Sequence, residues 1–150
     1  MVDRVRVVAQ AILDRLGHDG PAWRIHGIEP QGAARIAPED GLTLTFESIY
    51  PPGAPVPPQY PEPSNLSVVL DIDGESETET VTVYYSLDVP EAEAIAAMAS
   101  QIQDHAVEAA WGQPLPRCPG HAHMLTATVV DDIAVWQCPI TPGHHREPIV

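Results

Sequence analysis

The chain has 150 residues, a hydrophobic fraction of 44% and a formal net charge of −14 at pH 7, and all seven of its basic residues are arginine. This length suits one domain, or one domain with a small appended module, around a buried core. So acidic a chain repels nucleic-acid phosphates and anionic membranes, so we expect neither as a partner. Residues 1–17 lack the unbroken apolar run of a signal peptide, which favours a cytoplasmic protein.

The first predicted element is an amphipathic helix that ends near Gly17, a residue suited to the C-terminal end of a helix. Residues 23–28 then predict a short strand, and residues 42–48 alternate apolar and polar side chains as a second strand does. The helix is indicated by apolar residues at three- and four-residue steps, namely Val5, Val8, Ile12 and Leu16.

Residues 50–64 contain seven prolines, which a sheet interior does not accept, and they predict an extended surface loop. Residues 57–60, Pro-Pro-Gln-Tyr, match the short PPxY ligand of WW domains, although so proline-rich a segment produces this match easily by chance. We expect a protein partner, with this loop as one surface that contacts it. The sequence does not indicate an oligomeric state.

Two further strands are predicted at residues 66–72 and 80–87, joined by the acidic turn 73–79. A long helix follows, with Asp88 as its N-terminal cap and Glu91 completing a capping box, and Gly112 ends it. Its apolar stripe comprises Ile95, Met98, Ile102 and Ala109, and His105 near the stripe is expected to be a core or boundary residue rather than a functional one.

Both cysteines and four of the seven histidines fall between positions 118 and 145. Thiolate and imidazole are the ligands that Zn²⁺ prefers, and four of them close a tetrahedron. The run from Cys118 to His121 has the C-x2-H spacing of a metal-binding loop. This region is therefore the best candidate for a metal site.

A predicted hairpin brings these ligands together. Residues 124–130 and 133–138 resemble strands, and Asp131-Asp132 between them suits a two-residue turn. If Val130 faces Ile133, the register places Cys138 opposite Leu125 and on the same face as His123. That face is otherwise apolar and would exclude water from the thiolates.

Residues 116–145 resemble zinc-ribbon modules, in which Cys-Pro-x-His or Cys-Pro-x-Cys loops lie at the ends of a β-hairpin, and this resemblance implies a structural zinc. The segment also looks like the cysteine-histidine tails of actinobacterial and phage proteins of unassigned function. The sequence departs from the ribbon pattern at the second loop, because Cys138-Pro139 is not followed by another ligand two residues later. We favour Cys118, His121, His123 and Cys138 as ligands, with His144 as the alternate and His145 as a further option.

Other interpretations stay open. Cys118 and Cys138 can form a disulfide or remain unligated. A site of only Cys118, His121 and Cys138 would leave one metal position open, with His123 or Glu147 as a base, and this would suit a zinc-dependent hydrolase. An acidic inhibitor that mimics a nucleic acid is a third reading.

The predicted fold is α+β: an N-terminal helix, an antiparallel sheet of about four strands, a second long helix and a C-terminal zinc-ribbon-like β-hairpin. We expect residues 1–112 to form an α+β core domain and residues 113–150 a module packed on it. The function that follows is that of a non-enzymatic intracellular binding or adaptor protein with a structural zinc site. No catalytic residue is assigned.

Overall fold

The computed structural model describes residues 1–17, 22–31, 64–73 and 78–150, and this part of the chain has the predicted α+β class. The predicted strand 42–48, the proline-rich loop up to residue 63 and the centre of the acidic turn lie outside the described residues. The described elements are α1 (Val2–Gly17), β1 (Trp23–Pro30), β2 (Asn65–Asp73), β3 (Thr78–Ser86), α2 (Glu91–Ala109), β4 (Thr126–Val130), β5 (Ile133–Gln137) and β6 (Arg146–Pro148).

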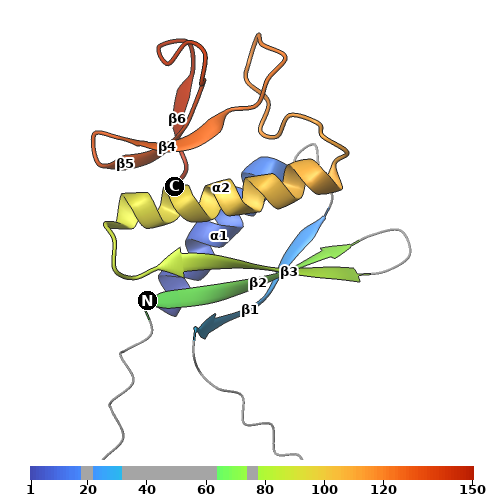
Figure 1. The fold of residues 1–150 in the computed structure, drawn as a ribbon, viewed down its shortest axis with the longest axis vertical. Coiled ribbons are helices and arrows are strands. Elements are labelled where there is room, and N and C mark those ends of the chain that lie inside the picture. The colour runs from blue at the N-terminus through green and yellow to red at the C-terminus, as the bar shows by residue number, and fades with distance from the viewer. Residues whose placement is uncertain (18–21, 32–63, 74–77) are drawn as a thin grey trace, which may run out of the picture.

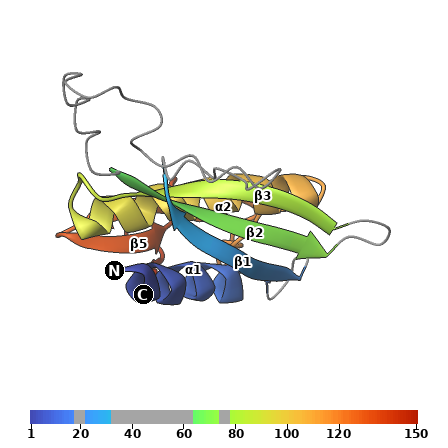
Figure 2. The ribbon, with the colours of Figure 1, turned by 90° about the horizontal axis from the view of Figure 1, so that it is seen from below.

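The first sheet has the strand order β1-β2-β3, and both pairings are antiparallel. Along β2 and β3 every second side chain is buried, as expected for a sheet with one covered face. Both helices lie on that face, α1 against β1 and α2 against β3 (Figure 2). The buried side chains of the two strands are Leu66, Val68, Leu70, Ile72, Val81, Val83 and Tyr85.

The second sheet, β4-β5-β6, packs on the other side of α2, so that this helix lies between two sheets (Figure 1). Its hairpin has the predicted register, from Val130 opposite Ile133 to Thr126 opposite Gln137. Asp131 and Asp132 have φ values of 51° and 61°, which is the backbone of a type I′ turn. The third strand, β6, extends the predicted hairpin into a sheet.

One hydrophobic core includes residues on both sides of position 112. Trp136 of β5 and Leu125, which directly precedes β4, are buried in it, together with Met98 of α2. Gln103 of α2 is a buried polar residue whose Nε2 donates hydrogen bonds to the carbonyls of Leu115 and Leu125, at 2.8 and 2.6 Å. The division of the chain into units 1–112 and 113–150 stays a prediction.

The ends of α2 differ in part from expectation. The N-cap is Pro90 and no side chain donates or accepts a capping hydrogen bond there, so the predicted Asp88 cap is wrong. The C-terminal end agrees, because Trp111 and Gly112 adopt positive φ and the Gly112 N–H donates to the Val107 carbonyl at 2.8 Å. Neither described helix is long and apolar enough to cross a membrane.

Candidate metal centre

The first ligand loop is a tight turn that its sequence explains. The His121 N–H donates to the Cys118 carbonyl at 3.2 Å, and Gly120 has a φ of 77°. Pro119 in the second position and glycine with positive φ in the third are typical of a type II turn. The Cys118 N–H then donates to the His123 carbonyl at 2.9 Å. Local backbone hydrogen bonds therefore bring these three residues close together.

The second ligand loop begins where β5 ends. The Cys138 N–H donates to the His145 carbonyl at 3.0 Å, which closes the loop, and the Thr141 N–H points at the Cys138 sulfur at 3.3 Å. This N–H···S contact lies at the position where a zinc ribbon would carry a second ligand. Sequence reasoning missed it, because a backbone amide has no signature in the residue type.

The two loops bring together Cys118, His121, His123 and Cys138, with one donor atom of each within 4.8 Å of all the others. Nδ1 of His121 is 3.5 Å from the Cys118 sulfur and 3.6 Å from the Cys138 sulfur, and Nε2 of His123 is 3.8 Å from the Cys138 sulfur. Zinc–ligand bonds of about 2.3 Å to sulfur and about 2.05 Å to nitrogen at tetrahedral angles imply S···N edges of about 3.6 Å. The cluster thus has the size of a four-coordinate site.

The orientation of His123 is fixed by its other ring nitrogen. Nδ1 lies 2.9 Å from the Met124 carbonyl, which can only accept, so Nδ1 carries the proton and donates. The Nε2 lone pair is then directed at the cluster. Ligating histidines in metal sites are commonly held in this way.

The pKa shifts of Cys138 and His121 favour the forms that bind a cation, whereas that of Cys118 does not. Both cysteines are fully buried, and both are free thiols rather than a disulfide. Burial, and then the adjacent Cys138, raise the pKa of Cys118. Burial also raises the pKa of Cys138. The backbone amides of Thr141 and Ile140 lower it, and together the lowering contributions outweigh burial, so that the pKa of Cys138 lies below its ordinary value. Burial, and then His144 and His123, lower the pKa of His121 and keep its ring neutral.

The alternate ligands lie elsewhere. His144 is exposed, its Nε2 contacts the Pro119 carbonyl, and its ring stacks on that of His121 with centroids 4.3 Å apart. Nε2 of His145 lies 3.4 Å from a Glu147 carboxylate oxygen, and the other oxygen of that carboxylate accepts a hydrogen bond from Arg15. His144, His145 and Glu147 are therefore outside the group of four donors.

Comparisons with protein-family models, with curated proteins and with solved structures find no match to this chain. The zinc-ribbon resemblance consequently concerns only the local arrangement of two loops and a hairpin, and it assigns no family to the whole chain. What the geometry supplies is a Cys2His2 group that can hold a metal ion.

Proposed function

We propose that this chain is a non-enzymatic binding protein whose C-terminal sheet is stabilised by a structural Zn²⁺ bound by Cys118, His121, His123 and Cys138. The observation that carries the proposal is the convergence of four donor atoms within 4.8 Å from two separate loops. Both cysteines support it, because they are free thiols and their sulfur atoms are therefore not already used in a disulfide.

The donor set favours zinc over other common cations. Two sulfur and two imidazole ligands at tetrahedral spacing suit Zn²⁺, whereas Mg²⁺ and Ca²⁺ prefer oxygen ligands. Two thiolates also neutralise the charge of the ion, so the loaded site places no net charge beside the hydrophobic core. Four protein ligands would leave no open position for a water molecule, which favours a structural role over a catalytic one.

Metal analysis of the full chain, purified without a histidine tag, tests the proposal. We expect about one zinc per chain, a loss of metal in Cys118→Ser and Cys138→Ser, and full retention in His26→Asn. His26 lies on β1 and contacts Asp71 rather than the cluster, so it controls for the loss of any histidine. A zinc content near zero in the unaltered chain, or equal content in the double cysteine variant, contradicts the proposal.

Removal of the metal should unfold the chain. Structural zinc sites in zinc-finger peptides have apparent binding free energies of about 10–16 kcal/mol, as large as the whole stability of a typical domain, about 5–15 kcal/mol. A strong chelator should therefore abolish the near-ultraviolet circular dichroism signal of Trp136, which lies in β5 next to the site. Added zinc should restore it.

The same protein loaded with Co²⁺ separates this proposal from its alternative, a zinc-dependent hydrolase. A four-coordinate spectrum with two thiolate ligands supports the structural site, and a five-coordinate spectrum that changes on adding anions supports an open position.

The partner surface is proposed to include the second sheet and the proline-rich loop 50–64. The strongly acidic charge is the reason to propose a protein partner rather than a nucleic acid.

A further inference from the structure

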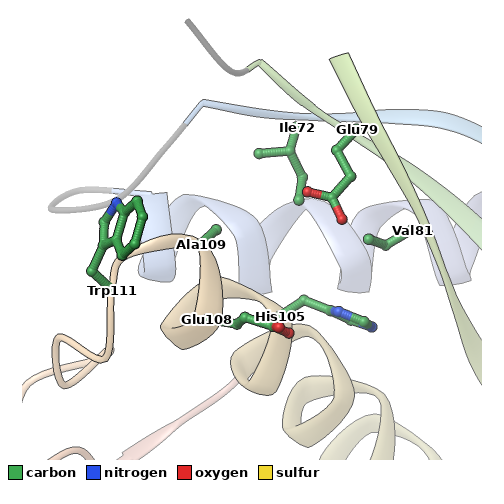
Figure 3. Close-up of a pocket in the computed structure, with 7 residues that line it drawn as sticks. All are labelled: Ile72, Glu79, Val81, His105, Glu108, Ala109 and Trp111. Atoms are coloured by element: carbon green, nitrogen blue, oxygen red, sulfur yellow. The ribbon is translucent and has the colours of Figure 1, made fainter. Parts of the chain in front are cut away.

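A cavity of about 210 Å³ opens where the last turns of α2 meet β2 and β3 (Figure 3), and it shares no lining residue with the metal cluster. Its apolar wall is formed by Ile72 and Val81 of the strands and Ala109 of the helix. Small-molecule sites usually have volumes of about 300–1,000 Å³. This cavity is smaller, and its size suits the end of one side chain.

Two carboxylates border the cavity. Glu79 extends from β3 toward α2, and Glu108 lies on the last turn of that helix (Figure 3). Within the described part of the chain, neither carboxylate group is hydrogen-bonded or ion-paired, and both residues are exposed. Every residue that lines the cavity belongs to the stretch between Arg35 and Arg117, which contains no arginine or lysine, and the one imidazole in the lining is that of His105 on α2. The cavity therefore has two carboxylates on its rim and no arginine or lysine in its lining to pair with them.

An exposed aromatic ring completes the rim. Trp111 stands at the end of α2 with 96% of its surface exposed, and its φ is 55°. A bulky residue at positive φ is strained, and here no burial of the indole compensates for that strain. The indole is also the side chain whose face attracts cations most strongly. A solvated tryptophan beside two unpaired carboxylates is the arrangement that a planar cation would satisfy.

We propose that this cavity binds the guanidinium group of an arginine side chain on a basic protein partner. A guanidinium group stacks on an aromatic face and donates to carboxylates on both sides, whereas an ammonium group is a compact point charge that does not stack. The net charge of −14 would attract a basic partner and increase its rate of association. The inference does not depend on the metal site.

Titration of the ¹⁵N-labelled chain with a small blocked peptide, acetyl-glycyl-arginyl-glycinamide, tests the inference by NMR. We expect saturable shifts of the Trp111 indole N–H and of the Ala109 amide, with little change at the buried Trp136. The same peptide with citrulline, which keeps the shape of arginine and removes its charge, should bind at least tenfold more weakly. The lysine peptide should also bind several-fold more weakly.

Variants of exposed residues locate the binding site, because substitutions at exposed positions leave the fold intact. The double change Glu79→Gln and Glu108→Gln should weaken binding of the arginine peptide at least tenfold, and Trp111→Gly should weaken it several-fold. Glu93→Gln, an exposed position in the first turn of α2, is the matched control and should bind like the unaltered chain. Absence of saturation, equal binding of the citrulline or lysine peptide, or equal binding by the double variant overturns the proposal.

Discussion

The sulfur of Cys138 lies 3.6 Å from Nδ1 of His121, although 17 positions separate the two residues in the chain. The same nitrogen is 3.5 Å from the sulfur of Cys118. A neutral imidazole nitrogen carries one proton or one lone pair, so it cannot fully satisfy two sulfur atoms through hydrogen bonds. A cation between the three atoms would be bound by all of them, and this relationship is the reason why we interpret the cluster as a metal site.

Substitution of single histidines should separate the ligands from their neighbours. We expect His123→Gln to weaken zinc binding more than 100-fold, because it would remove a ligand. His144→Gln should weaken it by about 10–100-fold at most, the range for residues that support a ligand, because His144 stacks on His121 and lies outside the group of donors. Competition with a chromophoric chelator measures both affinities. A larger loss in His144→Gln than in His123→Gln would reverse our assignment of the fourth ligand.

Stability should fall as the solution becomes acidic. Burial and the adjacent histidines lower the folded-state pKa of His121 below 6.5, so the unfolded chain takes up a proton at this residue before the folded chain does. The corresponding stabilisation is present above pH of about 6.5 and is lost as the pH falls through the folded pKa. Protons also compete with zinc for the same imidazole, which acts in the same direction.

Urea unfolding of the zinc-loaded chain between pH 8 and pH 5 measures this dependence. The His26→Asn variant should follow the unaltered chain, because His26 contacts Asp71 rather than the cluster. A stability that is constant over this range would show that His121 does not titrate as we infer.

The turn between β4 and β5 offers a stabilising substitution. Asp131 and Asp132 both have positive φ, which costs a non-glycine residue about 1–2 kcal/mol. Asp132→Gly should therefore raise the free energy of unfolding by about 0.5–1 kcal/mol, since Asp-Gly is a preferred pair for a type I′ turn. Thermal unfolding gives the value, and Asp132→Ala is the control that keeps the strain. A stabilisation by alanine equal to that by glycine would show that charge rather than backbone conformation is responsible.

Trp136 should tolerate phenylalanine better than its burial suggests. The side chain is 1% exposed, and its indole N–H has no hydrogen-bond partner within the described chain. Trp136→Ala should cost about 3–5 kcal/mol by leaving a cavity. Trp136→Phe should cost about 1–2 kcal/mol, because it loses volume but removes an unpaired donor that is worth about 1–3 kcal/mol. Equal losses in urea unfolding of the two variants would indicate that the indole N–H is satisfied.

Much of this fold follows from periodicity. The three- and four-residue steps of Val5 to Leu16 predicted α1, and the alternation in residues 66–72 and 80–87 predicted β2 and β3 close to their observed bounds. These predictions succeed because a buried face imposes the repeat of its element on the sequence. Asp131-Asp132 likewise identified the hairpin and its register, because a two-residue turn determines which positions pair.

Features that depend on tertiary contact were not predictable in this way. Strand β6 has three residues, too few to show a period, and it forms because β5 offers an edge beside it. The predicted N-cap of α2 was wrong because the helix begins after Pro90, although Asp88 is a residue that favours capping. The four donors were predicted from their spacing, but the stacking of His144 and the cavity beside Trp111 arise from segments that meet only in the folded chain.

The side-chain amide of Gln103 connects α2 to the segment that carries the first ligand loop. It donates to Leu115 and Leu125, the carbonyls on either side of the first ligand loop. Release of that loop would leave a buried amide without acceptors on the helix that covers the first sheet. If the chain binds zinc as proposed, its metal-free form would then be open to proteases along its length rather than only at its tail. Its abundance in a cell would follow the supply of the ion.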